Sequence, residues 1–352
     1  DAALPIYRPD APAQMVLEAG SGFASRHGVR IGDRVKVDMG AIARAGTADA
    51  RLAAAGSLPP QPRAEEYTIE FLRGRPPAGS NFSLRGPIQT NSAYRTFSFT
   101  YHADDRVVGG FMHVPGGPVP AGGFPVLIFN QELLPMASQA VRGGSSREGD
   151  FFVRHGYITI HFDSRSDRLS SSAAGERRPD FSMSSTKEML ALIQALKSAR
   201  AASMDLERIG MWGQSMGAAS ALGAMVLSED VRAYVLFAPV SAGAEDNFYM
   251  FSPEEIALLR QTYGPPGAEM YRRISPLTYF ADVASPVQLH HGEADTAVPI
   301  LFSEKIFSAL TRLGKRAEFY RYPGEKHKFA DSWPLAAERA LQFFDRYVKE
   351  AL

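Results

Sequence analysis

From about residue 95 onward, short apolar segments alternate with amphipathic ones, and this alternation restricts the possible folds more than any other feature. The apolar segments are rich in β-branched and aromatic residues and lie at 125–129, 157–162, 208–213, 233–239, 286–292 and 317–323. Strands that are apolar along nearly their whole length are typical of parallel sheets covered on both faces. The pattern predicts an α/β fold, a mostly parallel central sheet with helices on both faces.

Three segments between or after these strands have helical periodicity. They are predicted at 185–199 with a capping box of Ser185 and Glu188, at 300–313 with Gly314 behind it, and at 333–350 with Ser332 as the cap.

Two further patterns precede the alternating part. The stretch 95–115 predicts a β-hairpin that turns at 103–106, and "YTIEFLRG" at 67–74 predicts a strand.

The domain organisation is expected to have two parts, the second of which contains an insertion. Residues 1–65, rich in Ala, Pro and Gly, predict an N-terminal extension or arm, which either packs on a second subunit in a homodimer or covers the site. Residues 66–352 form the catalytic domain. Within it, residues 241–285 exceed what a simple crossover needs and predict a small cap insertion. The chain begins at Asp1 rather than Met, so either an export signal was removed, which would make the protein periplasmic or secreted, or the sequence was trimmed.

Composition excludes several classes of function. The formal net charge is zero, so the chain has no electrostatic reason to bind nucleic acid. It contains no cysteine, which excludes a thiolate nucleophile and disulfides. No run of about 18 apolar residues predicts a membrane span. No motif has convincing metal-ligand or nucleotide-binding spacing, so no metal or cofactor is expected.

The strongest motif is Gly213-Gln214-Ser215-Met216-Gly217, a G-x-S-x-G sequence between a predicted strand and a predicted helix. A sharp turn there would lift the Ser215 hydroxyl above the sheet, close to the backbone N–H groups of a helix N-terminus. An ordinary Gly-Ser turn is the alternative. The strand before the motif and the helix after it favour a nucleophile.

A serine nucleophile needs a base, and the base needs a group that orients it. Asp295 follows the strand at 286–292, and His327 follows the strand at 317–323. Asp295 could instead cap a helix, and His327 could be an exposed loop residue between two lysines. Because each follows its own strand in the order Ser215, Asp295, His327, we interpret them as a catalytic triad. His290 and His291 lie closer to the strand body and are interpreted as structural.

The sequence motifs around Ser215, Asp295 and His327 resemble those of a known family. Residues from about 95 to 352 resemble the α/β-hydrolase fold, in its dienelactone hydrolase-like and prolyl oligopeptidase-like branches, through "GQSMG", "HGEADTAVP", "GEKHKF" and "PVLIFNQELLP". The resemblance implies that the backbone N–H groups of Leu133 and Met216 form the oxyanion hole, and that Glu132 faces the nucleophile. Two departures matter: dienelactone hydrolases have a Cys nucleophile, and the N-terminal part here is too short and too poor in repeats for the peptidases' β-propeller.

The predicted function is therefore serine hydrolysis of small-molecule carboxylic esters through an acyl-enzyme. Small-peptide or amide hydrolysis, aminopeptidase-like, is the alternative, and a non-catalytic hydrolase-fold binding protein is a further one. In the insertion, Phe248 and Tyr249 are proposed to line an aromatic substrate pocket. For most aromatic residues there, packing within a small helical layer is the competing interpretation.

Overall fold

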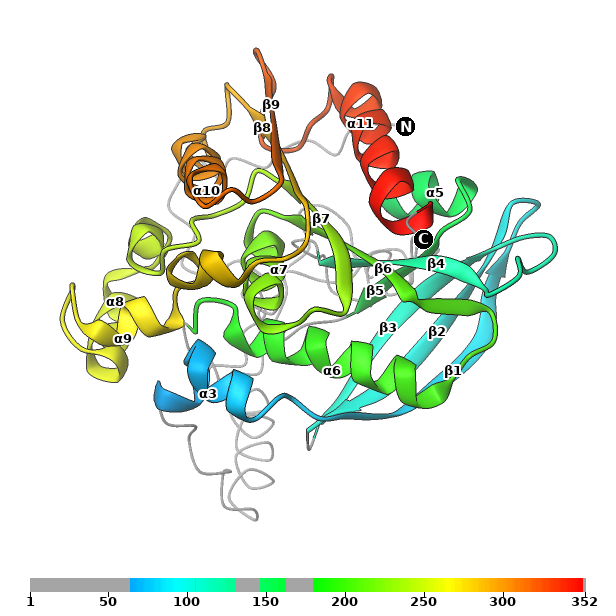
Figure 1. Cartoon of the computed structure of the whole chain (residues 1–352), viewed down its shortest axis with the longest axis horizontal. Helices are drawn as coiled ribbons and strands as arrows, with labels where there is room; N and C mark the ends of the chain where they lie inside the picture. The colour runs from blue at the N-terminus through cyan, green and yellow to red at the C-terminus, as the bar shows by residue number, and fades with distance from the viewer. Residues whose placement is uncertain (1–63, 105, 131–145, 163–179, 351–352) are drawn as a thin grey trace, which may run out of the picture. The chain divides into compact units, whose positions relative to one another are not determined.

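The computed structural model describes residues 64–104, 106–130, 146–162 and 180–350 (Figure 1). Within these ranges the chain forms one nine-stranded sheet in the order β1-β2-β3-β5-β4-β6-β7-β8-β9. The strands from β1 to β5 pair antiparallel, and those from β5 through β4 to β9 pair parallel. The strands are β1 (Gly79–Thr90), β2 (Tyr94–Ala103), β3 (Arg106–Pro115), β4 (Phe124–Asn130), β5 (Ile158–Phe162), β6 (Met204–Gln214), β7 (Val231–Phe237), β8 (Val287–Gly292) and β9 (Ala317–Tyr322). The predicted mostly parallel α/β sheet is confirmed, as is the predicted hairpin, which forms β2 and β3.

Helices cover both faces of this sheet. Those on one face are α6 (Met183–Ala199), α7 (Met216–Leu227) and α10 (Leu301–Arg312). Those on the other are α5 (Arg147–Arg154) and α11 (Trp333–Phe344), which continues into a π-helical turn at Asp345–Lys349.

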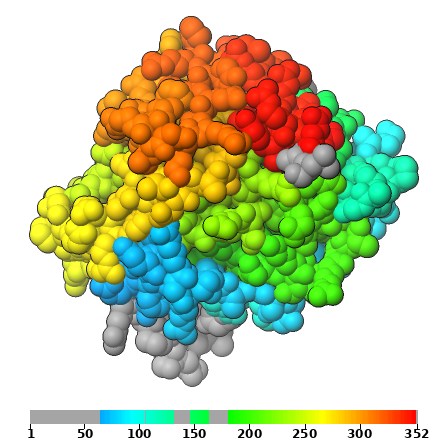
Figure 2. All heavy atoms as spheres, in the orientation of Figure 1, coloured from blue at the N-terminus to red at the C-terminus, as the bar shows by residue number. Residues whose placement is uncertain are grey.

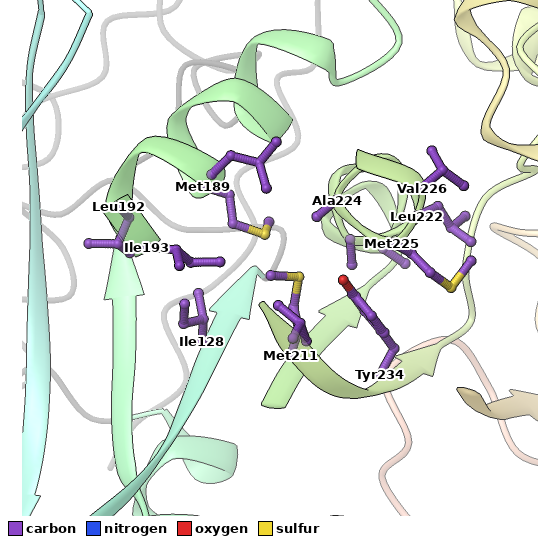
Figure 3. Close-up of a cluster of buried hydrophobic side chains, with 14 of the residues drawn as sticks. Ile128, Met189, Leu192, Ile193, Met211, Leu222, Ala224, Met225, Val226 and Tyr234 are labelled. Atoms are coloured by element: carbon purple, nitrogen blue, oxygen red, sulfur yellow. The ribbon is translucent and has the colours of Figure 1, made fainter. Parts of the chain in front are cut away.

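Successive residues of the central strands point to opposite faces, so each strand contributes to two cores. Ile128, Met211 and Tyr234 pack beneath α6 and α7, against side chains such as Met189 and Leu222 (Figure 3). Their neighbours Leu127, Trp212 and Val235 are fully buried in the second core, with α11. A strand that is apolar on both faces is therefore the expected outcome of the near-continuous apolar runs.

One predicted strand was wrong. Residues 67–74 form the end of a 3-10 turn (Ala64–Tyr67) and the short helix α3 (Ile69–Gly74), which Thr68 caps by accepting a hydrogen bond from the Phe71 N–H at 3.3 Å. Ile69 and Leu72 are both buried, and their spacing of three residues places them on one face of a helix. Helix α3 has only 6 residues, which is less than two helical turns, so the spacing of its apolar residues was a weak indication of a helix.

The predicted helix caps are confirmed only in part: Gly314 follows α10 with a φ of 69°, whereas the caps of α6 and α11 differ from the prediction. Helix α6 begins at Met183, so Ser185 and Glu188 lie inside it and form no capping box, and Asp180 binds the Ser184 N–H instead. Glu188 pairs with Arg106 of β3. Ser332 is the N-cap of α11, but its side chain makes no capping bond.

The segment between β7 and β8 consists of a 3-10 turn (Glu245–Met250), α8 (Pro253–Tyr263), α9 (Glu269–Ile274) and a second 3-10 turn (Pro276–Asp282). The α3 region packs against it, and Figure 2 shows their surfaces in contact. Arg273 pairs with Glu65 at 2.7 Å, and Tyr279 donates a hydrogen bond to Glu70. Apart from residues 64 and 65, the predicted N-terminal extension lies outside the described residues. No helix within the described ranges has the length and apolar composition that crossing a bilayer requires.

Candidate functional site

Ser215 occupies a strained turn between β6 and α7. Its φ and ψ are 55° and −124°, a conformation that is rare for a residue with a side chain. The turn is fixed on both sides, because the Ser215 N–H donates to Phe237 O of β7 at 3.0 Å and Ser215 O accepts from the Ala218 N–H at 3.0 Å. A Cβ at Gly213 would lie 2.7 Å from the Ala218 Cα, so the first glycine of the motif allows α7 to start this close to β6.

The structure brings Ser215, Asp295 and His327 together. His327 Nε2 lies 3.0 Å from Ser215 Oγ, and His327 Nδ1 lies 2.7 Å from Asp295 Oδ2. Strands β6, β8 and β9 are parallel, so their carboxyl ends, and the loops that follow them, share one edge of the sheet. The two distances are those of a continuous hydrogen-bonded chain from hydroxyl to imidazole to carboxylate.

Asp295 is held as a carboxylate. Its Oδ1 accepts from the N–H groups of Ala297 and Val298 at 2.8 and 2.9 Å, so it structures its own loop rather than capping α10, which begins at Leu301. Burial raises the pKa of Asp295, but hydrogen bonds from His291, His327 and the Val298 N–H lower it, and the net pKa lies well below the ordinary value. An ionised Asp295 can fix the proton of His327 on Nδ1 and leave Nε2 free to accept.

The sequence did not single out His291 as part of this site. It is fully buried, and its Nε2 lies 3.3 Å from Asp295 Oδ2. His290 lies on the opposite face, bonded to Tyr322 Oη and Gln288 Oε1, as expected for a structural residue. Alternation along β8 was the available signal: two consecutive histidines in a strand point to opposite faces, and only one can approach the loop that begins after Gly292.

The two predicted oxyanion donors are described only in part. Met216 is the first residue of α7 and directly follows Ser215, so its N–H has no acceptor within the helix. Strand β4 ends at Asn130, whose register partner is Gly213. Glu132 and Leu133 lie outside the described residues.

A small, mostly apolar cavity of about 20 Å³ lies beside Met216, the residue after Ser215, with Ser182, Ser241 and Asn247 as its polar lining. Its lining includes Met216, Ala219 and Val240 near the turn, and Met250, Phe251 and Phe181 beyond them. Phe248, predicted to bind substrate, packs in an aromatic cluster with Phe181 and Tyr271, at ring distances of 6.2 and 5.4 Å. Tyr249 is half-exposed and its hydroxyl points to Ala297 O at 3.5 Å. Neither lines this pocket, whereas the next two residues, Met250 and Phe251, do.

Within the described ranges, no group of three or more His, Asp or Glu side chains is arranged to hold a metal ion.

Comparison with known proteins places this site in context. Residues 147–351, more than half of the chain, match the sequence profile of the prolyl oligopeptidase family. The uncharacterized peptidase YuxL of Bacillus subtilis (strain 168) is 39% identical over 56 residues, which are 16% of this chain and 8% of YuxL.

Two solved structures show the same fold. The Pyrococcus horikoshii acylaminoacyl peptidase is 19% identical with a TM-score of 0.58, over 74% of this chain and 43% of that protein. A cold-adapted esterase from an Arctic intertidal metagenomic library is 14% identical with a TM-score of 0.51, over 76% of this chain and 99% of the esterase. The matched region thus covers less than half the length of YuxL and of the Pyrococcus horikoshii peptidase.

Proposed function

Since this chain belongs to the prolyl oligopeptidase family of serine hydrolases, we propose that it cleaves carboxylic esters through an acyl-enzyme intermediate on Ser215. The observation that supports this most directly is the chain of hydrogen bonds from Ser215 Oγ to His327 at 3.0 Å and from His327 to Asp295 at 2.7 Å. Nucleophile, base and orienting carboxylate are thus within bonding distance before any substrate binds.

In the proposed mechanism, Ser215 Oγ attacks the carbonyl carbon of the ester while His327 Nε2 takes its proton. Asp295 keeps the imidazole in the required tautomer and stabilises the imidazolium. The negative oxygen of the tetrahedral intermediate is held by the N–H of Met216 and, by resemblance, that of Leu133, and each donor is worth about 3 kcal/mol. The imidazolium then protonates the leaving alcohol. Water, activated by His327, hydrolyses the acyl-enzyme and restores Ser215.

The cavity beside Met216, about 20 Å³ in volume, favours a small and uncharged acyl group. Met216, Val240 and Met250 give it apolar walls, and among its described lining residues there is no Asp, Glu, Lys or Arg. A free α-ammonium group, as in an aminopeptidase substrate, would need a carboxylate partner when removed from water. The described part of the pocket offers none, although Glu132 is proposed to face Ser215.

Peptide or amide hydrolysis is the second candidate. It is favoured by the names of the relatives, since YuxL is described as a peptidase and the Pyrococcus horikoshii protein as an acylaminoacyl peptidase. A substrate whose N-terminus is acylated would bring an uncharged group to the apolar pocket. The metagenomic esterase, which this chain matches over nearly the whole of that protein, favours the ester.

One experiment tests both candidates. The purified protein is assayed with p-nitrophenyl acyl esters, aminoacyl p-nitroanilides and N-acylaminoacyl p-nitroanilides, beside Ser215→Ala. We expect ester turnover at the highest kcat/KM and its loss in Ser215→Ala. Faster cleavage of an anilide would select the peptidase function, and ester turnover that survives in Ser215→Ala would refute the serine mechanism.

A further inference from the structure

Glu325 is a buried carboxylate that the proposed mechanism does not use. It lies in the loop between β9 and α11 and is 3% exposed. Its Oε1 accepts from the backbone N–H groups of Lys326 at 2.9 Å and Ala330 at 3.1 Å. Its Oε2 accepts from those of Asp331, at 3.0 Å, and Ser332. Four backbone donors thus converge on one side chain.

These four donors enclose His327. Lys326 precedes it, and residues 330–332 follow it and lead into α11, so the carboxylate closes the loop that presents the imidazole. The positive end of α11 adds to the attraction. Burial raises the pKa of Glu325, but the N–H groups of Ser332, Lys326 and Ala330 lower it, with a net lowering. Glu325 is therefore ionised at neutral pH, in the state that accepts all four bonds.

The carbonyl groups of the same loop are held from other elements. Gln214, the residue before the nucleophile, donates through Nε2 to His327 O at 3.3 Å. Arg147 of α5 donates to Phe329 O at 2.8 Å and to Lys328 O at 3.2 Å, and its guanidinium lies 4.0 Å from the centre of the Trp333 ring. The loop is thus fixed through its N–H groups by Glu325 and through its C=O groups by Gln214 and Arg147.

The backbone of Glu325 also contacts the loop that carries Asp295. Its carbonyl accepts from the Ala294 N–H at 2.9 Å. A Cβ at Gly292 would lie 2.2 Å from that same carbonyl oxygen, so only glycine lets the two loops approach this closely. A shift of Glu325 would therefore change the position of His327 relative to both Asp295 and Ser215.

We propose that Glu325 is a positioning residue of the hydrolase reaction: its carboxylate gathers the N–H groups on both sides of His327 and so sets the imidazole at bonding distance from Ser215 and Asp295. The proposal rests on the proposed role of His327 as the base. A group displaced by about 1 Å can lose a factor of about 100 in rate, so a positioning residue is visible in kinetics without touching substrate.

The test variant is Glu325→Gln, which keeps the shape of the side chain but replaces one accepting oxygen with an amide that only donates. Two measurements follow the triad itself: the second-order rate of Ser215 labelling by a fluorophosphonate, and kcat and KM for p-nitrophenyl acetate. We expect the labelling rate and kcat to fall about 10- to 100-fold, with KM changed less than about twofold, because the imidazole is misplaced while the substrate pocket is not.

Glu188→Gln is the matched control, because Glu188 is also a buried glutamate but contacts Arg106, away from the triad loops. It should lose stability and keep the labelling rate. If Glu325→Gln unfolds cooperatively and is labelled at the wild-type rate, the proposal is overturned and Glu325 only caps α11. If that variant does not fold, Glu325→Asp, which withdraws the carboxylate by one methylene, is judged by the same criterion. A folded wild-type protein that is not labelled at Ser215 would instead refute the proposed function.

Discussion

His291 Nε2 lies 3.3 Å from Oδ2 of Asp295, the same oxygen that accepts the hydrogen bond from His327. Nε2 also lies 3.0 Å from Val298 O, and Nδ1 lies 2.8 Å from Ser303 Oγ. A carbonyl can only accept, so Nε2 bears the proton and the Ser303 hydroxyl donates to Nδ1. The carboxylate is thus flanked by two imidazoles, of which only His327 reaches the nucleophile.

This relationship predicts two losses in His291→Leu. Stability should fall by about 1–3 kcal/mol because the partners of the imidazole lose their bonds in a buried site, and kcat should fall because Asp295 loses a donor. Urea unfolding and ester kinetics measure the two effects. Ser303→Ala is the control: it removes the hydroxyl that donates to His291 Nδ1 but leaves Nε2 in place, so it should reduce stability alone. Wild-type kcat in folded His291→Leu would show that the contact has no role in the reaction.

The substitution Asp295→Asn tests the tautomer of His327. The new amide can place its NH2 where Oδ2 was and donate to Nδ1, which would move the imidazole proton to Nε2 and prevent it from accepting from Ser215. We expect kcat for an ester to fall by about 10⁴, with KM nearly unchanged. A loss of less than about tenfold would mean that His327 does not depend on Asp295 for its orientation.

Buried histidines should make the fold sensitive to acid. Burial, partly offset by Asp150, lowers the pKa of His113 to about 4. Burial also lowers the pKa of His161 and His290 well below 6.5. Below pH 6.5 these histidines bind protons in the unfolded chain but not in the folded one. Their contribution to the unfolding free energy is therefore fully present above pH 6.5 and is lost as the pH falls towards and below 4.

His161→Phe should reduce that sensitivity. Neither nitrogen of His161 has a hydrogen-bond partner among the described residues, and its ring stacks on Phe111 and Phe129 at 4.7 Å each, so a phenyl ring fits the same stack without a proton to bind. The slope of unfolding free energy against pH between 6 and 4 should fall by about 1.4 kcal/mol per unit. Urea titrations across this range measure it, and parallel curves for the two proteins would contradict the prediction.

The pattern of apolar residues along the sequence made the parallel half of the sheet predictable. Each of the six apolar runs became a strand of the sheet, and those that form β4 to β8 lie inside the sheet, where both faces are covered and most positions are apolar. Strand β1 was missed because it lies at the edge of the sheet and most of its residues are exposed, including Leu84 and Ile88, and because it contains Gly86 and Pro87. A strand at an edge has little apolar pattern to read.

The site was predictable to the extent that it depends on chain order. Ser215, Asp295 and His327 each follow a strand, so topology alone brings them to one edge. Glu325 and Arg147 were not found, because their partners are backbone atoms of a loop, and such partners leave no pattern in the side chains. The lining of the cavity beside Met216 was not predicted either. Met250 and Phe251 line it, whereas Phe248 and Tyr249 do not. Which of these side chains face the cavity depends on the 3-10 turn at Glu245–Met250, which was not predicted.

The packing of the turn at Ser215 predicts that Gly213→Ala is destabilising. Its new Cβ would meet the Ala218 Cα at 2.7 Å, so β6 or α7 would have to move. We expect a loss of about 1–3 kcal/mol in unfolding free energy, together with slower labelling of Ser215. Gly74→Ala is the control, since nothing lies within 4 Å of its added Cβ. Equal stability of the two variants would show that the turn tolerates a larger spacing.

The apolar pocket predicts opposite effects from two substitutions of its lining. Ala219 lies on α7, Met250 is the last residue of the 3-10 turn in the insertion, and both line the cavity beside Met216. Ala219→Phe should fill the space and lower kcat/KM for p-nitrophenyl hexanoate while sparing the acetate. Met250→Ala should enlarge it and shift the preference towards longer chains. One methylene in such a pocket is worth about 1–3 kcal/mol, so the ratio of the two kcat/KM values should change by at least about tenfold in each direction. The ratio cancels any general loss of activity, since both esters share the triad. If it stays at the wild-type value in both variants, the acyl group binds elsewhere, and the pocket beside Met216 does not select the substrate.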